Sequence, residues 1–342
     1  MTESTLDSRD GEDHRGAFFD VTAIQHLSAI DLQTRLQGAG WDKPEPPTRA
    51  KMLLALLRGH AATGRSIVGG GMLEVLPDGF GFLRNPSKDL VPDVDDFYVS
   101  PSQVQRCSLR TGDMVRGTLR PPRGHEANFA MLKIHDVEGA VPHKPGERLL
   151  FEELTATCPH EPLRLGKAGN KGLREFDRQH GLLLGQRMVL RGDPEQVTLL
   201  TRSIQRAATQ LAMIQTLTLV LDHRPQAGQH YREGGDFVVV SDDMTTPESQ
   251  TRAMRLVLER AKRLVERGSH VLLVIDALDG YVRALEATSS TNRQHAVATA
   301  KCVLASARAT EGGGSLTTVC TLRTDNPSLD ALRPSLDHDV VV

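Results

Sequence analysis

The chain has 342 residues, 39% of them hydrophobic, and a formal net charge of −2. This length allows two or three domains with packed cores. The near-neutral charge excludes general binding of polyanions over the whole surface, so a nucleic-acid function would need a local basic face.

The cysteines and the N-terminal sequence define the expected compartment. The four cysteines lie too far apart for a CxxC metal site and suggest no disulfide framework. The first residues, "MTESTLDSRDGEDHRG", are polar and lack the apolar core of a signal peptide. No apolar run approaches the ~20 residues that span a bilayer. We therefore expect a cytoplasmic protein with no membrane partner and no metal site.

The N-terminal part is expected to be a tail followed by helices. Residues 1–19 are polar and aperiodic, which predicts disorder. Residues 20–66 place apolar side chains at three- and four-residue spacing, which predicts a small helical module. The "DKPEPP" segment divides this module, and Thr48 is expected to cap its second helix.

Residues 67–138 change to a period of two. The segments "GMLEVLPDGFGFLR", "DDFYVS", "DMVRGTLRPP" and "NFAMLKIHDV" predict about five short strands. So many short strands in this length favour a small closed barrel such as an OB-fold. Residues 139–180 contain scattered Pro, Gly and Lys, and we predict a linker whose one ordered piece is "RLLFEELTA".

Residues 181–342 alternate predicted strands and helices. The strand candidates are "RMVLRG", "TLTLVLDH", "DFVVVSDD", "HVLLVIDA" and "LTTVCTLR". The best helix of the sequence follows Thr246, a suitable N-cap, and begins at Pro247. This alternation predicts a mostly parallel sheet covered by helices, so the whole chain is a multidomain α+β and α/β protein.

The barrel sequence contains a possible base-stacking platform. Phe80 and Phe82 are two residues apart and point to one face of a strand, and Arg84 continues that face. Exposed rings there would stack nucleobases, and a carboxylate such as Asp96, two residues before Tyr98, would accept a hydrogen bond from an exocyclic amine. Phenylalanines that fill the barrel core are the alternative.

Two features favour the binding interpretation of the barrel. Glycines 79 and 81 flank Phe80 and would leave room for a base against the backbone. Between residues 101 and 132 there are five arginines against two acidic residues, which predicts a local basic face. The five are Arg106, Arg110, Arg116, Arg120 and Arg123.

The chain resembles the bacterial transcription termination factor Rho family. The segments that carry the resemblance are "GGGMLEVLPDGFGFLR", "DDFYVSPSQVQRCSLRTGDMVRGTLRPPR" and "FEELTA". The resemblance implies a helical N-terminal module, an OB-fold that binds pyrimidine-rich single-stranded RNA, and a RecA-like ATPase domain in a ring hexamer. It places the primary RNA site at Phe80, Phe82, Arg84, Asp96, Tyr98 and Glu126. The family has an aromatic residue where this chain has Asn128, so one wall of the base pocket is expected to be missing.

The sequence "VLRGDPEQVTLL" predicts a strand, a turn and a helix, which is the place of the family's phosphate-binding loop. Such a loop needs GxxxxGK[ST], with a Lys that neutralises phosphate and a hydroxyl that holds Mg²⁺. The resemblance aligns Gln196 with the Lys and Val197 with the hydroxyl residue, while Asp193 and Glu195 add negative charge. We therefore expect neither ATP nor Mg²⁺ to bind usefully.

Other parts of the family's catalytic apparatus are also altered. The resemblance places His223 at the position of the catalytic Glu, and Asp276 at the Walker-B position. The first RNA-translocating loop falls at "YVRALEATSST", and the second has Pro334 in place of a Gly. The arginine finger and closing helices would follow Val342, so residues 181–342 are expected to form a degenerate, truncated RecA-like domain.

Four functions fit these patterns to different degrees. The first is a catalytically inactive Rho-like RNA-binding protein that modulates termination, either by competing for RNA or by mixing with authentic Rho subunits. Its expected partners are pyrimidine-rich single-stranded RNA and either authentic Rho subunits or further copies of this chain. The second is a working ATP-dependent termination factor, against which the altered corner argues. The third is a protein-interaction module whose barrel does not bind RNA, and the fourth is a decaying gene product without a role.

Overall fold

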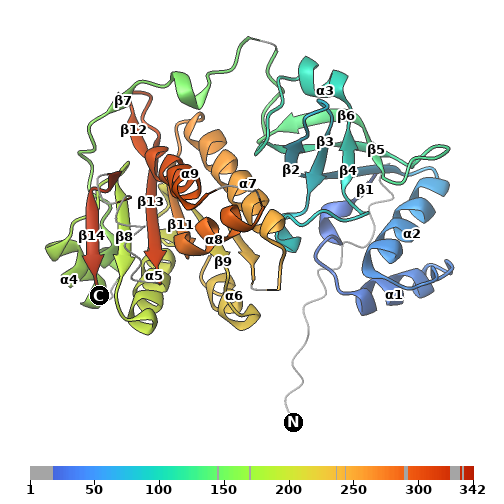
Figure 1. The fold of residues 1–342 in the computed structure, drawn as a ribbon. Helices are drawn as coiled ribbons and strands as arrows, with labels where there is room; N and C mark the ends of the chain where they lie inside the picture. The colour runs from blue at the N-terminus through green and yellow to red at the C-terminus, as the bar shows by residue number, and fades with distance from the viewer. Residues whose placement is uncertain are drawn as a thin grey trace.

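The computed structural model describes residues 18–144, 146–168, 171–235, 237–242, 244–288, 292–323, 332 and 335–342. Pro334 and the rest of the predicted second RNA loop up to residue 334, except residue 332, lie outside these ranges. Along the chain come a small helical module, a β-barrel and a large helix-covered sheet (Figure 1). No helix within the described ranges combines the length and apolarity needed to cross a membrane.

The N-terminal module consists of one short strand, a 3-10 helix and two α-helices. Thr48 caps the second helix as predicted, because its hydroxyl accepts a hydrogen bond from the backbone N–H of Lys51 at 3.3 Å. Residues 18 and 19, predicted to belong to a disordered tail, instead lie in a strand that pairs in parallel with the barrel. The elements are β1 (Phe18–Asp20), η1 (Val21–Ala23), α1 (Ala29–Gly38) and α2 (Arg49–Ala62).

The barrel is closed, as expected for an OB-fold. β2 pairs with β3 along one edge and with β5 along the other, in the order β1-β2-β3-β4-β6-β5. Phe97 and Phe129 are fully buried in its core. The elements are β2 (Ser66–Val75), β3 (Gly81–Arg84), η2 (Pro86–Lys88), β4 (Phe97–Val99), α3 (Pro101–Arg106), β5 (Met114–Arg120) and β6 (Ala130–Val137).

The predicted linker, 139–180, contains more structure than its sequence indicated. Its short strand β7 pairs antiparallel with β12 and so extends the large sheet. Phe151, within "RLLFEELTA", is buried in the core of the large sheet. The elements are η3 (Phe151–Glu153), β7 (Ala156–Thr157), η4 (Leu165–Ala168) and α4 (Lys171–Gln179).

The large sheet contains all five strands predicted for it. Its parallel part has the order β10-β9-β11-β13-β8-β14. The strands are β8 (Arg187–Arg191), β9 (Ile214–Leu221), β10 (Phe237–Ser241), β11 (His270–Asp276), β12 (Arg308–Thr310), β13 (Ser315–Leu322) and β14 (His338–Val341). The helices that follow them are α5 (Pro194–Thr209), α6 (Pro225–Arg232), α7 (Pro247–Val265), α8 (Leu278–Thr288) and α9 (Arg293–Ala305).

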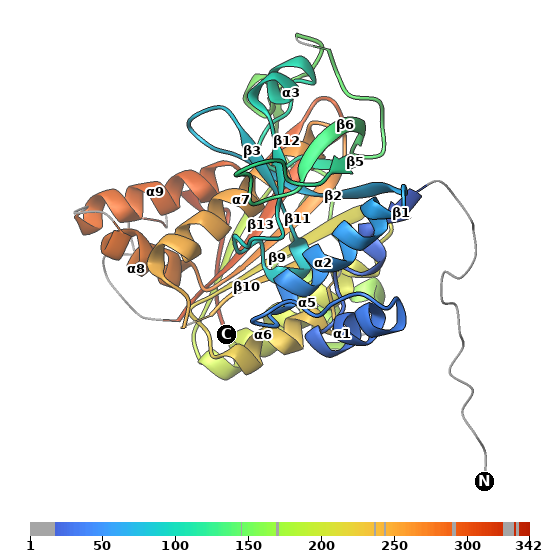
Figure 2. The ribbon, with the colours of Figure 1, turned by 90° about the vertical axis from the view of Figure 1, so that its right-hand side faces the viewer.

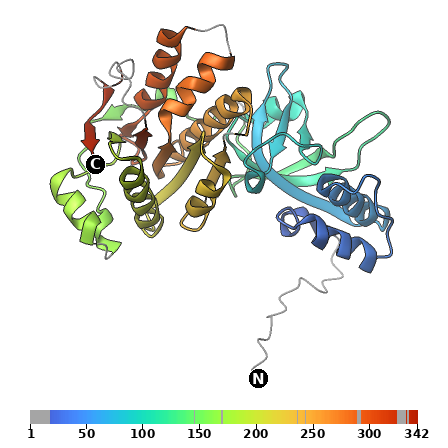
Figure 3. The same ribbon diagram turned by 60° about the horizontal axis from the view of Figure 1, so that its bottom comes forward.

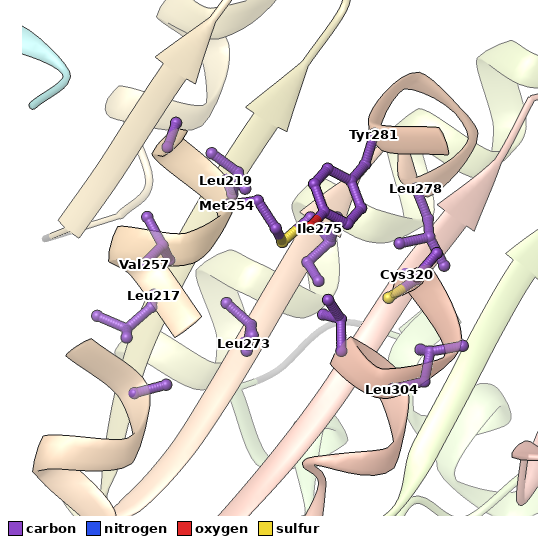
Figure 4. Close-up of a cluster of buried hydrophobic side chains, with 14 of the residues drawn as sticks. Leu217, Leu219, Met254, Val257, Leu273, Ile275, Leu278, Tyr281, Leu304 and Cys320 are labelled. Atoms are coloured by element: carbon purple, nitrogen blue, oxygen red, sulfur yellow. The ribbon is translucent and has the colours of Figure 1, made fainter. Parts of the chain in front are cut away.

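Helices cover both faces of this sheet (Figure 2). Residues of β11 alternate between two cores: Leu273 and Ile275 pack with α7, α8 and α9, whereas Leu272 and Val274 pack with α4 and α5. Figure 4 shows the first of these cores, in which Met254 of α7 lies over the sheet. A strand buried on both faces explains the continuous apolar run "VLLVI".

The barrel docks against α7. Arg255 of α7 reaches Glu74 of β2 at 2.6 Å, and Arg110 reaches Glu266 at 2.7 Å. Arg148 joins Asp113 at 2.5 Å to Glu266 at 3.3 Å. These ion pairs are partly or fully buried, so they hold the barrel in one orientation on the sheet domain.

Candidate nucleic-acid interface and nucleotide-site corner

Three aromatic rings gather on one face of the barrel. Phe82 and Tyr98 lie opposite each other on β3 and β4, and Phe80 immediately precedes β3. The ring centroids are 5.8 Å apart for Phe80 and Phe82, 5.7 Å for Phe80 and Tyr98, and 6.0 Å for Phe82 and Tyr98. All three rings are half-buried and lie outside the barrel core. The core alternative for Phe80 and Phe82 therefore does not hold.

The glycines beside Phe80 differ in their role. Gly79 has a φ of +85°, a left-handed conformation that suits glycine at this turn. Gly81 faces the barrel interior, where an added Cβ would lie 2.8 Å from the carbonyl oxygen of Glu74. The sequence interpretation that Gly81 leaves room for a base is therefore wrong, because the missing side chain serves the close approach of β2 and β3.

Arg84 lies under the aromatic face instead of on it. Its side chain is 7% exposed, and its guanidinium contacts Glu74 at 2.8 Å and Asp96 at 2.5 Å. Its Cζ lies 5.0 Å from the centroid of the Phe82 ring. In this geometry the guanidinium supports the Phe82 ring from below, and the contact of Arg84 with a phosphate or a base edge stays a prediction.

Asp96 is also buried, with 3% of its side chain exposed. Its carboxylate accepts hydrogen bonds from Arg84 and from the backbone N–H of Asp93 at 2.7 Å. Burial raises the pKa of Asp96 although Arg84 and the Asp93 N–H oppose the shift. The predicted contact of this carboxylate with a base amine does not follow from this position, because the carboxylate already binds Arg84 inside the domain.

The β5–β6 connection carries Glu126 and Asn128. Glu126 is exposed and forms a two-fold contact with Arg120 at 2.6 and 2.9 Å. The hydrogen bond from Arg120 and that from the backbone of Arg123 lower the pKa of Glu126 to about 2. The amide of Asn128 donates to the carbonyl oxygens of Val94 and Asp96, each at 3.0 Å. Asn128 therefore braces the loop before β4.

The five arginines between residues 101 and 132 do not form one basic face. Arg110 points to the sheet domain, Arg116 pairs with Asp20, and Arg120 pairs with Glu126. Of these five arginines, Arg106 and Arg123 are the two whose side chains have no carboxylate partner among the described residues. Three of the five arginines in the predicted basic face are thus neutralised by carboxylates.

The turn between β8 and α5 is the corner predicted from "VLRGDPEQVTLL". Asp193 is the N-cap of α5, and its carboxylate accepts a hydrogen bond from the N–H of Gln196 at 3.0 Å. The N–H of Asp193 donates to the carbonyl oxygen of Val342 at 3.3 Å. The Gln196 side chain is exposed, whereas Val197 is buried in the core under α5. One of the N–H groups at the start of α5 is therefore already bound by the chain's own carboxylate.

Asp276 and His223 meet at the same edge of the sheet, where β9 and β11 end. His223 Nε2 lies 3.1 Å from Asp276 Oδ2, and Arg323 contacts the His223 ring. The hydroxyls of Tyr231 and Thr321 donate to the two oxygens of Asp276, each at 2.5 Å. No group of three His, Cys, Asp or Glu side chains in the described ranges could hold a metal ion.

The partners of Asp276 stabilise its charged form. Burial alone would raise the pKa of Asp276, but the hydrogen bond and charge of His223, together with Arg323 and Thr321, lower it from 3.8 to about 2. A carboxyl whose pKa is lower in the folded state stabilises the fold above its ordinary pKa. This stabilisation is lost as the pH falls from about 4 towards 2.

We expect Asp276→Asn to lower the free energy of unfolding at pH 7 by about 2 kcal/mol, which is the equivalent of the pKa difference. Urea unfolding at pH 7, 4 and 3 measures this effect, and the difference from the unchanged protein should shrink below pH 4. Asp222→Asn, which removes a half-exposed partner of Arg283 at the same edge, is the control and should cost under about 1 kcal/mol. A pH-independent deficit in Asp276→Asn would contradict the assigned cause.

Sequence reasoning missed Glu74, Tyr231, Thr321 and Arg323. Glu74 occupies the alternate position of a barrel strand, where an acidic residue resembles an ordinary exposed one, yet it is 1% exposed. Tyr231 and Arg323 lie 45 and 100 residues from their partners Asp276 and His223. The one signal in the sequence was the position of Arg323 directly after a predicted strand, where a side chain can reach the end of the sheet.

Comparisons with known proteins identify the family of this chain and of its barrel. The family model of the Rho termination factor, RNA-binding domain, matches residues 69–143. Transcription termination factor Rho of Chromobacterium violaceum is 34% identical over 323 residues, which cover 90% of this chain and 77% of the relative. The corresponding protein of Escherichia coli is 30% identical over the same shares, and that of Haemophilus influenzae is 32% identical over 81% of this chain and 70% of the relative. The chain therefore belongs to the family of transcription termination factor Rho, and its barrel is that family's RNA-binding domain.

Proposed function

We propose that this protein binds pyrimidine-rich single-stranded RNA through its barrel, does not hydrolyse ATP, and modulates Rho-dependent termination. The aromatic face of Phe80, Phe82 and Tyr98 is the observation that carries the RNA-binding part. Half-exposed rings with centroids about 6 Å apart offer adjacent surfaces on which successive bases can stack. Arg84 supports this surface from the interior, so the rings are held in place before RNA arrives.

The contacts of Asp193 in the turn between β8 and α5 support the proposal that the protein does not hydrolyse ATP. A triphosphate needs free N–H groups and positive charge at the start of α5, but the Asp193 carboxylate takes the Gln196 N–H and would repel phosphate. Both oxygens of Asp276 are held by hydroxyl groups and His223, which leaves this carboxylate poorly placed to bind Mg²⁺. The residues at this edge therefore do not fit a nucleotide and its metal.

We expect no saturable ATP binding in calorimetry and no ATP hydrolysis above background with poly-pyrimidine RNA. A catalytically complete Rho serves as the positive control in the same buffer. RNA-stimulated hydrolysis that disappears in Asp276→Asn would overturn the proposed inactivity and favour the working termination factor.

The proposed route of modulation is mixing with complete Rho subunits. In RecA-like rings a nucleotide lies between two subunits, so one subunit whose corner does not hold phosphate would disable the site that it carries in the ring. The sheet and α7 pack around a large buried core, which supports this route because mixing requires a folded domain that docks on its neighbours. Competition for RNA is the other route, and it uses the barrel alone.

Titration into a termination assay at saturating RNA distinguishes these two routes. If mixing is the route, inhibition should rise more steeply than the fraction of subunits that this chain contributes. It should also persist in the Phe80→Ala/Phe82→Ala variant. Inhibition that needs both rings and is relieved by excess RNA would exclude mixing and leave competition. Co-purification of this protein with a complete Rho, with and without RNA, is the direct control for mixed assemblies.

A further inference from the structure

A pocket of about 270 Å³ lies over the outer side of α5, between α4 and α6. Figure 3 shows these three helices side by side, with α5 in the middle. The pocket is lined mainly by the second half of α5, from Leu199 to Gln210. Arg202 lies nine residues after Asp193, which is roughly 13 Å along the helix. The pocket is therefore separate from the nucleotide-site corner and from the barrel.

Two arginines in this pocket have no partner in the protein. Arg202 and Arg206 are one helical turn apart and point to the same side of α5. Neither forms a hydrogen bond or an ion pair with any described residue, and the Nε atom of Arg202 is buried without a hydrogen-bond acceptor. Arg202 is half-buried and Arg206 is exposed. Most of the other half-buried or buried arginines in the described ranges, such as Arg84 and Arg148, contact carboxylates. The buried Nε of Arg202, next to a second guanidinium without a protein partner, makes this wall of the pocket suited to an anion.

The rest of the lining suits an anion attached to a small organic group. None of the ten lining residues is acidic. Ser203, Gln210 and His230 bring further polar groups, whereas Leu173, Leu199 and Ala207 form an apolar part of the wall. His230 has a weak contact with Glu233 at 4.0 Å, the one acidic side chain paired with a lining residue in the described ranges.

We propose that this pocket binds a small phosphorylated molecule, with its phosphate held by Arg202 and Arg206. The planar guanidinium groups match the tetrahedral oxygens of a phosphate through paired N–H···O hydrogen bonds. The volume is about nine times the roughly 30 Å³ that a water molecule takes up in the liquid, which is enough for a phosphate and a small attached group. The site depends neither on RNA binding by the barrel nor on the absence of ATP hydrolysis.

Calorimetry with inorganic pyrophosphate on the full chain, at constant ionic strength, tests the site. We expect saturable binding of one pyrophosphate, weakened roughly tenfold or more by Arg202→Gln and by Arg206→Gln. Arg178→Gln is the matched control, because Arg178 on α4 is 77% exposed, pairs with Glu175 and does not line the pocket. Asp193→Asn, which keeps an N-cap but removes the charge at the corner, should leave pyrophosphate affinity unchanged.

Thermal unfolding without ligand separates a binding role from a structural one. Like charges one turn apart on a helix repel, so Arg202→Gln and Arg206→Gln should keep or raise the Tm of the free protein. With pyrophosphate present, only the unchanged protein and Arg178→Gln should gain in Tm.

Several results would overturn the phosphate site. One is a lowered Tm of the ligand-free Arg202→Gln protein. Another is a loss of pyrophosphate affinity in Arg178→Gln as large as that in Arg202→Gln. The third is tighter pyrophosphate binding in Asp193→Asn combined with unchanged binding in Arg202→Gln. Citrate that binds as tightly as pyrophosphate would refute the preference for phosphate. Weaker binding of single-stranded RNA by Arg202→Gln, without any pyrophosphate binding, would assign the two arginines to the RNA surface instead.

Discussion

Replacing Phe80 or Phe82 by alanine is expected to weaken binding of C-rich single-stranded RNA by roughly 1–3 kcal/mol per ring, or roughly 5- to 150-fold. Each ring is half-exposed, and the two make an edge-on contact with an interplanar angle of 83°. Removing one ring deletes a stacking surface and also loosens the other. The double variant should therefore bind RNA too weakly to saturate at micromolar protein.

Fluorescence anisotropy with a labelled C-rich oligonucleotide measures this loss. Phe18→Ala is the matched control, because Phe18 is 60% exposed on β1 and belongs to no aromatic contact in the described ranges. Circular dichroism should show that all variants are folded, since none of the three side chains lies in the barrel core. Unchanged RNA affinity in the double variant would favour the protein-interaction module over RNA binding.

Arg84→Met is the second substitution with a large expected effect. It should lower the free energy of unfolding by about 3–5 kcal/mol. The substitution keeps the apolar stem but leaves Glu74 and Asp96 as buried carboxylates, 1% and 3% exposed, without their shared guanidinium. Glu74 retains Arg255 at 2.6 Å, whereas Asp96 retains only the backbone N–H of Asp93. The RNA affinity should fall as well, because the Phe82 ring loses the group that supports it.

The pH dependence of this variant identifies the cause. Burial already raises the pKa of Asp96 with Arg84 present, and without Arg84 the pKa should rise further. A carboxyl with a raised folded-state pKa gains proton binding on folding, so it costs stability as the pH rises through that range. Urea unfolding should show the deficit of Arg84→Met shrinking from pH 7 to pH 5.

Arg116→Met is the control for loss of an arginine on the same barrel. Its side chain is 48% exposed and pairs with the half-buried Asp20, so it should cost about 1 kcal/mol or less. An equal cost of the two substitutions would show that general charge, and not the buried triad, determines the stability of the barrel.

The sequence by itself determined the barrel, the parallel sheet and the altered corner. The short apolar segments in "GMLEVLPDGFGFLR" predicted the barrel strands β2 and β3, and the continuous apolar run "VLLVI" reflects the burial of β11 on both faces. The cap at Asp193 is equally local, since its partner Gln196 is three residues away. Spacing likewise placed Phe80 and Phe82 on one face.

Only the tertiary structure decided what the charged residues do. Arg84 and Asp96 resemble surface residues in the sequence, but in the fold the buried Arg84 contacts both Asp96 and Glu74. Glu74 is also bound by Arg255 of α7, 181 residues away in the chain. The linker strand β7 forms because β12 offers an open edge, and the pKa of Asp276 falls because His223 and Arg323 converge from two other strand ends. A carboxylate or guanidinium is stable either in water or in an ion pair. Residue type and spacing do not show which of these two environments the side chain occupies in the fold. The packing of distant segments decides between them, because only packing removes the water.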